Sequence, residues 1–191
     1  DGFQRRHQLA RDLDILVLDW SRRAGDRYCL PAGRLREPLS AARDAQAVVV
    51  THAPEDWNEA ALRSGLPGPY QGLKVFRGDH VPLRLRPLKG GAALPLSWLK
   101  DRAITALSGI GNPAAFEEQL TRLGAVIKAR RFADHHPFAP VDLRGIDGAL
   151  VCTSKDAVKL AALDLGKESS VLVLEMELRI SPKRIFEGIL P

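Results

Sequence analysis

The sequence is poor in cysteine, in aromatic residues and in long apolar runs, and each scarcity argues against a class of protein. Its two cysteines, Cys29 and Cys152, lie far from any Cys-x-x-Cys pair or Cys/His cluster. This favours reduced, buried thiols over a disulfide framework or a zinc site. No apolar run approaches the roughly 20 residues that cross a bilayer as a helix. Aromatic residues make up 6% of the chain, and no basic patch interleaved with aromatics indicates a nucleic-acid partner.

The phosphate-binding signature GxxxxGK[ST] is also missing from these residues. The only Gly-Lys pair, Gly166–Lys167, is followed by Glu168 and has no glycine five positions upstream. These residues therefore contain no Walker A loop. Because the chain starts at Asp1 without a methionine, we expect it to be the C-terminal part of a larger protein.

What is present is an ordinary globular composition with an excess of positive charge. Hydrophobic residues make up 45% and charged residues 27% of the 191 residues, and the net charge is +5. Such a chain has enough apolar residues for a packed core. The charge favours an anionic partner such as a phosphorylated ligand, nucleic acid or an acidic membrane surface, or it reflects an arginine-rich composition alone.

Apolar segments alternate with helical patterns in the first third of the chain. Strands are expected at 13–19 and 45–52, and helices at 37–45 and 56–64. This alternation is typical of an α/β fold with a mostly parallel sheet. Residues 66–95 are rich in proline and glycine, and RGDH (77–80) is interpreted as a tight turn between extended stretches at 72–76 and 81–88. We expect these two stretches to form a two-stranded linker.

A second α/β pattern follows the expected linker. Strands are predicted at 103–109, 126–132, 148–153 and 169–178, and helices at 114–125 and 154–163. Asn112 is a plausible N-cap with Pro113 at the first helical position. Phe116, Leu120 and Leu123 fall on one face of that helix.

Two short motifs in this second part carry candidate chemistry, and each has a structural alternative. SGIGNP (108–113) places a glycine-rich turn before a helix N-terminus, where backbone amides hold an anion or only close a tight turn. ADHHPF (133–138) supplies a carboxylate and two imidazoles, which handle protons, bind a metal, or merely cap backbone groups in a solvated loop.

Two further motifs stand beside predicted strands or helices. TSKD (153–156) follows a strand, where nucleotide-binding sheets place polar groups, although the same residues also serve as a helix cap. LREP (35–38) pairs Arg36, suited to bidentate phosphate binding, with Glu37, which can ligate Mg²⁺; a surface ion pair is the alternative.

Taken together, these segments resemble one family, the tetraacyldisaccharide 4′-kinases of the lipid A pathway. DGFQ (1–4), LPAGRLREP (30–38), GIGNP (109–113) and DHHPF (134–138) occur in the order typical of that family. The resemblance covers nearly the whole chain. It implies an α/β fold with three parts: the remainder of a P-loop-type α/β/α domain at 1–68, a two-stranded β-ribbon linker at 69–96, and a smaller Rossmann-like α/β domain at 97–191.

The resemblance also implies an activity, the ATP-dependent phosphorylation of the 4′-hydroxyl of tetraacyldisaccharide 1-phosphate, with ATP and Mg²⁺ as cofactors. It implies catalytic roles for Asp1, His135 and His136, with His135 the better candidate to orient an upstream aspartate base. Asp1 and Glu37 would bind the metal. The implied nucleotide- or phosphate-binding residues are Gln4, Arg36, Glu37, Thr153, Lys155 and Asp156.

The sequence departs from the family pattern at three points. The family motif reads Asp-Asp-Gly-Phe-Gln, and only its second aspartate is present, as Asp1. Arg5 stands where the family usually has histidine, and Ser154 replaces a glutamate. The role of position 154 is therefore left open.

A lipid substrate implies a peripheral enzyme at the cytoplasmic face of the bacterial inner membrane, without a nucleic-acid partner. On its own the chain is expected to be inactive and poorly soluble, because half of a sheet leaves an unpaired edge. Two other functions are considered. One is a DHH-type phosphoesterase that holds a divalent metal with Asp134, His135 and His136; the other is a non-catalytic module that binds anionic lipid or nucleic acid.

Overall fold

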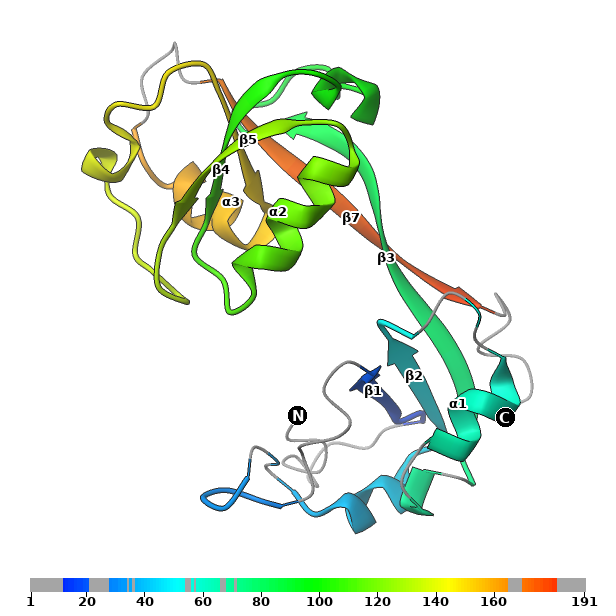
Figure 1. The fold of residues 1–191 in the computed structure, drawn as a ribbon. Coiled ribbons are helices and arrows are strands. Elements are labelled where there is room, and N and C mark those ends of the chain that lie inside the picture. The colour runs from blue at the N-terminus through cyan, green and yellow to red at the C-terminus, as the bar shows by residue number, and fades with distance from the viewer. Residues whose placement is uncertain are drawn as a thin grey trace. The chain divides into compact units, whose positions relative to one another are not determined.

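The structure, a computed structural model, describes residues 12–20, 28–33, 35, 37–53, 56, 58–65, 68–70, 72–164 and 170–181. The chain divides into two compact units, the first formed by Asp1–Val81 and Leu178–Pro191 and the second by Pro82–Glu177. The described strands form a seven-stranded sheet in the order β1-β2-β3-β7-β6-β4-β5 (Figure 1). The predicted α/β class is confirmed.

The first unit is built on three parallel strands. β1 (Ile15–Asp19) pairs with β2 (Ala47–Thr51), which pairs with the start of β3 (Lys74–Pro87). All five residues of β2 are buried, because cores lie on both faces of the sheet. Val48 and Val50 pack with Trp20 and Tyr70 on one face, and Val49 packs with Phe76 on the other.

Two helical predictions in this unit have different outcomes. Helix α1 (Glu59–Gly65) lies where a short helix was expected. The segment expected as an α-helix over 37–45 is instead the 3₁₀ helix η2 (Leu39–Asp44). It spans only six residues between the N-cap Pro38 and the C-cap Ala45. A run this short suits the tighter 3₁₀ winding.

The predicted turn at RGDH is wrong. Residues 74–87 form the single continuous strand β3, and its neighbour in the sheet is β7 (Val171–Ser181) rather than a second stretch of the same segment. Arg77 Nε donates to both carboxylate oxygens of Asp79 at 2.8 Å, so the charged pair lies along the strand. The chain passes from one unit to the other within β3, after Val81, and within β7, after Glu177. The division into three parts at 68/69 and 96/97 stays a prediction.

The second unit follows the prediction element by element. Strands β4 (Ala103–Ser108), β5 (Val126–Arg131) and β6 (Ala149–Thr153) are joined by helix α2 (Pro113–Arg122) and by a long loop that contains the 3₁₀ helix η5 (Pro140–Leu143). Helix α3 (Ser154–Ala161) then leads to β7. The pairs β4·β5, β4·β6 and β6·β7 are all parallel.

The two helices cover opposite faces of this sheet. Phe116 and Leu120 of α2 pack with Ile104 and Val151, as their predicted common helix face requires. On the other face α3 packs with strand residues of the opposite parity, in a cluster that includes Leu107, Leu150, Cys152, Ala157 and Leu160. Consecutive strand residues therefore point into different cores, which is the period-two pattern of a sheet buried on both sides.

Both cysteines are free thiols. Cys152 is fully buried, and this burial raises its pKa to about 12, whereas Cys29 is only partly buried. Within the described ranges, no helix is long and apolar enough to cross a membrane.

Candidate functional site

Three of the motifs meet at one edge of the second unit. Parallel register aligns Ser108 of β4 with Arg131 of β5, and Leu107 with Cys152 of β6, so the three strands end together. Two loops follow, at 109–112 and 132–136, and β6 passes directly into the first turn of α3 at 153–156. We refer to these residues as the three-loop edge. The carboxyl edge of a parallel sheet is where α/β proteins bind their ligands.

Asp156 connects two of these loops from inside the protein. Its exposed fraction is 0%. Carboxylate oxygen Oδ2 accepts hydrogen bonds from the Gly109 amide at 3.1 Å and from the Thr153 hydroxyl at 2.8 Å. The Thr153 hydroxyl oxygen in turn accepts from the Asp156 amide at 3.2 Å, which caps helix α3. Asp156 is therefore an internal brace and does not reach the surface to contact a nucleotide.

Two buried polar atoms at this edge are left without a hydrogen-bond partner among the described residues. They are Asp156 Oδ1 and Ser108 Oγ. Lys159 Nζ lies 3.8 Å from Asp156 Oδ1, a distance for an ion pair rather than a hydrogen bond. A lysine near a buried carboxylate offsets part of the cost of burying that charge.

Gly109 is closely packed at the centre of the edge. A Cβ atom there would lie 3.2 Å from Phe138 Cζ, 3.3 Å from the Ala133 carbonyl oxygen and 3.3 Å from Asp156 Oδ1. The backbone of SGIGNP thus fits between the other two loops. Asn112 caps α2 as predicted, because its side-chain oxygen accepts from the Ala115 amide at 3.3 Å.

His135 is held by its backbone while its side chain points to solvent. Its amide donates to the Gly109 carbonyl at 3.2 Å and to Asp134 Oδ1 at 3.0 Å. The backbone is in the left-handed region, with φ of 62°. The imidazole is 90% exposed, and its Nε2 is 3.8 Å from Asp134 Oδ2. This side chain is accessible to a group outside the unit.

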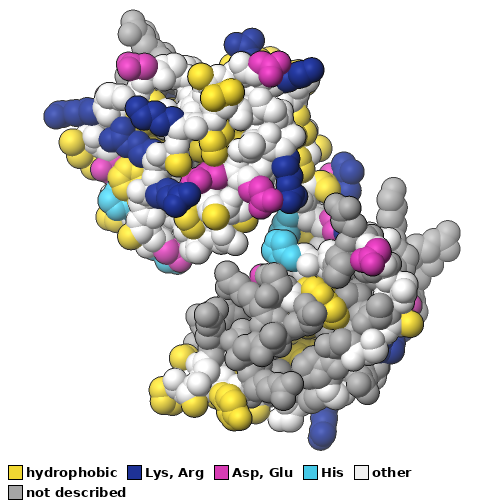
Figure 2. All heavy atoms as spheres, in the orientation of Figure 1, with side chains coloured by type: hydrophobic (Ala, Val, Ile, Leu, Met, Phe, Trp, Pro, Cys, Tyr) yellow, Lys and Arg dark blue, Asp and Glu magenta, His cyan; other side chains and the backbone are white. Residues whose placement is uncertain are grey.

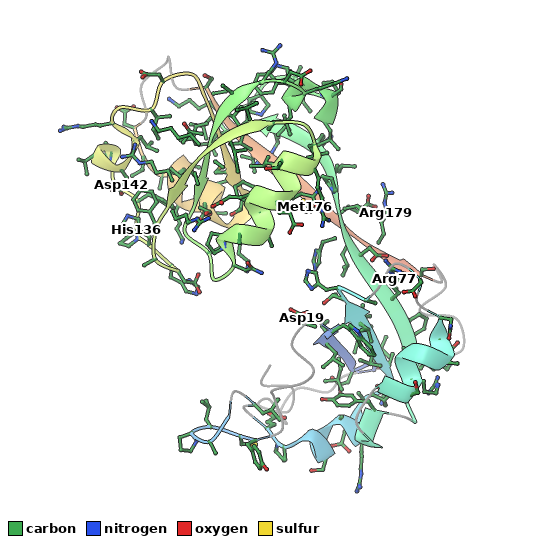
Figure 3. The ribbon with its side chains drawn as sticks, in the orientation of Figure 1. Asp19, Arg77, His136, Asp142, Met176 and Arg179 are labelled. Carbon is green, nitrogen blue, oxygen red and sulfur yellow. The ribbon has the colours of Figure 1, made fainter. Side chains whose placement is uncertain are left out.

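His136 is engaged inside the loop. Its Nε2 donates to Asp142 Oδ2 at 2.9 Å, and its ring stacks on Phe132 with centroids 4.5 Å apart. Figure 3 shows the two labelled side chains meeting in the loop after β5. Asp142 also accepts from the Ala139 amide at 2.8 Å. That backbone bond, followed by the bond from His136, holds the pKa of Asp142 below its usual value.

The remaining predicted residues fall into two groups. Lys155 lies at the three-loop edge, in the first turn of α3, with an exposed side chain. Glu37 lies in the first unit, partly buried. Asp1, Gln4 and Arg36 lie outside the described residues. The edge therefore gathers His135, His136, Thr153, Lys155 and Asp156.

The three side chains of the DHH motif do not converge. His136 turns to Asp142, whereas His135 and Asp134 are exposed. Across the described part of the chain, no group of three or more His, Cys, Asp or Glu side chains could hold a metal ion. The alternative of a DHH-type phosphoesterase with this ligand set is wrong.

Sequence reasoning missed a polar cluster at the carboxyl edge of the first unit. His52 Nδ1 lies 3.1 Å from Asp19 Oδ1, and its ring stacks against His80 with centroids 6.0 Å apart. Asp19 ends β1, His52 follows β2, and His80 follows the part of β3 that pairs with β2. For Asp19 and His52, the available signal was their position at the ends of two expected parallel strands.

A family model described as tetraacyldisaccharide-1-P 4′-kinase (LpxK) matches residues 1–190. The chain belongs to the tetraacyldisaccharide 4′-kinase family. Among curated members, the Syntrophus aciditrophicus protein is 36% identical over 205 residues, covering 98% of this chain and 54% of that protein. The Anaeromyxobacter sp. protein is 41% identical over 173 residues, covering 85% of this chain and 45% of its own length.

A solved structure of the same family also matches. It is LpxK from Aquifex aeolicus, whose crystal structure was determined in complex with ATP. The TM-score is 0.71 at 29% identity, covering 100% of this chain and 56% of that one. This chain thus spans about half the length of the tetraacyldisaccharide 4′-kinases that it matches. Two of the motifs that carried the resemblance, GIGNP and DHHPF, contact each other at the three-loop edge.

Proposed function

We propose that the full-length protein in which these residues occur transfers the γ-phosphate of ATP to the 4′-hydroxyl of tetraacyldisaccharide 1-phosphate. Family membership over nearly the whole chain supports this proposal. The supporting structural observation is the three-loop edge, where an exposed imidazole and an exposed lysine lie on a braced backbone. Phosphoryl transfer depends on positioning and charge stabilisation, which such a braced edge provides.

In this proposal the two histidines have different roles. His135 presents an exposed imidazole on a fixed backbone, so it is suited to orient or tune a carboxylate base supplied by another part of the protein. His136 is committed to Asp142 and to the Phe132 ring, and it fixes the shape of the loop. The histidine that the resemblance favoured is also the one with an accessible side chain.

ATP and Mg²⁺ belong to the proposal as well. Lys155 and the N-terminus of α3 lie at the same edge and suit an anionic ligand. Asp156 would act through Thr153 and Gly109, since its own carboxylate is buried. Of the two proposed Mg²⁺ ligands, Asp1 and Glu37, only Glu37 is among the residues that the structure describes. Bound Mg²⁺ would neutralise negative charge on the phosphates of ATP. Asp1, Gln4 and Arg36 keep their proposed roles from the resemblance.

The acyl chains of the proposed substrate place the reaction at a membrane. We therefore also propose peripheral attachment at the cytoplasmic face of the bacterial inner membrane. The net charge of +5 supports attraction to anionic lipid headgroups.

The test is ATP-dependent phosphorylation of tetraacyldisaccharide 1-phosphate by the purified full-length protein. We expect His135→Ala to lower kcat by about 100-fold or more while the melting temperature is unchanged. His136→Ala should lower the melting temperature and reduce kcat much less. Absence of transfer by the unmodified protein would contradict the kinase proposal and leave the binding module as the alternative. A larger kcat loss in His136→Ala would contradict the assignment of roles.

A further inference from the structure

A loop in the first unit presents two neighbouring apolar side chains to solvent. Residues 28–35 are closed by three backbone hydrogen bonds: Leu35 N to Tyr28 O at 3.2 Å, Leu30 N to Leu35 O at 2.9 Å, and Gly33 N to Cys29 O at 3.1 Å. The side chains of Tyr28 and Leu30 are 66% and 65% exposed. In Figure 1 the loop is the blue segment at the lower left, and Figure 2 shows hydrophobic side chains at that end.

The backbone of the loop is closely packed at Gly33. A Cβ atom at Gly33 would lie 2.2 Å from the Tyr28 carbonyl oxygen and 3.0 Å from Tyr28 Cβ. No side chain fits there, so the two arms of the loop approach as closely as backbone atoms allow.

A single exposed apolar residue is ordinary on a protein surface. This pair instead combines an aromatic residue, Tyr28, with an aliphatic one, Leu30. Tyrosine is enriched where an apolar environment meets water, since its ring is apolar and its hydroxyl is polar. Leucine and the adjacent Pro31 add apolar surface. An aromatic residue and a leucine on a closed loop suit shallow insertion among lipid headgroups and the first acyl carbons.

The charge of the surrounding sequence is complementary to an anionic bilayer. Residues 22–36 contain one acidic residue, Asp26, and five arginines: Arg22, Arg23, Arg27, Arg34 and Arg36. Arg34 is part of the loop sequence, between Gly33 and Leu35. Basic residues beside an apolar segment attract anionic headgroups at short range.

We propose that the loop of residues 28–35 docks on the anionic bilayer that contains the substrate, an inference that rests on the proposed function. Glu37, a proposed Mg²⁺ ligand, follows Leu35 by two residues, which limits the distance between their Cα atoms to about 7 Å. Insertion of Tyr28 and Leu30 would therefore hold the reaction centre at the depth of the headgroups. The sugar hydroxyl that accepts the phosphate lies at the same depth.

The first experiment measures insertion directly in the full-length protein. Leu30→Trp is compared with Val126→Trp, a matched control because Val126 is 63% exposed on β5 of the second unit. Both proteins are mixed with vesicles of phosphatidylglycerol and phosphatidylethanolamine that carry brominated acyl chains. We expect a blue shift and quenching of the added fluorescence for Leu30→Trp and neither effect for Val126→Trp. Equal quenching, or none in either variant, overturns the proposal.

The second experiment measures affinity. Tyr28→Ser/Leu30→Ser should weaken vesicle binding by about tenfold or more, because two apolar side chains no longer enter the bilayer. Val126→Ser should bind vesicles like the unmodified protein. Unchanged binding by the double variant overturns the proposal. The melting temperatures of all variants should agree, since the substituted side chains are exposed.

If Tyr28 and Leu30 contact something other than the bilayer, the experiments give different results, and each of these overturns the proposal. If Leu30→Trp is already blue-shifted without vesicles, another part of the full-length protein covers the loop. If the double variant raises KM for substrate but keeps its vesicle affinity, the loop contacts acyl chains of the substrate. If it abolishes a dimer in sedimentation velocity, a second copy covers the loop. A protein that inserts Leu30→Trp but shows no kinase activity contradicts only the proposed function.

Discussion

At the scale of single residues, buried polar groups organise the three-loop edge. Asp156 lies beneath the surface and fixes the Gly109 amide and the Thr153 hydroxyl. The Gly109 carbonyl then accepts from the His135 amide, so the brace reaches the exposed histidine through one residue. The contribution of Asp156 to a site is therefore positional.

Replacing Asp156 tests this brace. Asp156→Ala removes the acceptor of two buried donors, and we expect a loss of about 2–4 kcal/mol in the free energy of unfolding. Asp156→Asn keeps one acceptor oxygen and should lose less. Urea unfolding of the full-length protein measures both, with the exposed Asp147→Ala as the control. Equal losses for the alanine variants at 147 and 156 would exclude a bracing role.

Asp142 gives a prediction about pH. The Ala139 amide and His136 hold its pKa below the usual value of 3.8, and the charge of Arg130 acts in the same direction. A lowered pKa means that ionised Asp142 stabilises the folded state above that value, and that this stability is lost as pH falls through the folded pKa. The melting temperature of the unmodified protein should exceed that of Asp142→Asn near neutral pH.

The same difference should shrink in acid. Differential scanning calorimetry at pH values from about 6 to about 3 follows it. Val141→Ala, which leaves the carboxylate in place at an exposed neighbour, is the control. A gap between the two melting temperatures that stays constant across this range would show that Asp142 does not contribute through its charge.

At the scale of elements, β3 shows why a turn-like sequence can form a strand. The RGDH segment has turn residues, but Gly78 lies opposite Thr51 in the parallel pairing of β2 and β3. A Cβ atom at Gly78 would lie 2.6 Å from Val49 Cγ1 and 3.2 Å from Leu178 Cδ1. The glycine is present for close packing between strands rather than for a turn.

This packing predicts the effect of a methyl group. Gly78→Ala should lower the free energy of unfolding by about 1–3 kcal/mol, because the added carbon overpacks a buried site. In an exposed turn the same change would have little effect. Combining it with Val49→Ala, which makes room, should give less than the sum of the two separate losses. Strict additivity in urea unfolding would contradict direct contact between the two positions.

At the scale of the whole molecule, these 191 residues carry only part of what the proposed phosphoryl transfer needs. They have the three-loop edge but no Walker A loop. Among the strands that the structure describes, β1 forms one edge of the sheet, and its Val17 is 65% exposed. An apolar residue on an edge strand favours association with other chains.

The 191-residue chain by itself should therefore show no phosphoryl transfer and should aggregate. Val17→Lys should lower aggregation, measured by light scattering, without conferring transfer activity, because a charged side chain blocks edge-to-edge pairing. Val158→Lys, at an exposed apolar position on α3, is the matched control and should change aggregation less. Transfer activity from this chain alone would contradict the expected dependence on a phosphate-binding loop.

The sequence by itself determined the α/β class, the strands and helices of the second unit, the Asn112 cap and the family. These follow from local patterns: apolar runs, helical spacing and motif order. Only the tertiary structure decided that β3 continues through Gly78, that Asp156 is buried, and that His136 rather than His135 bonds to Asp142. The first two outcomes depend on neighbours far away in the chain, as between Gly109 and Asp156, which are 47 residues apart. A local pattern shows which groups are polar, whereas folding selects their partners and their burial.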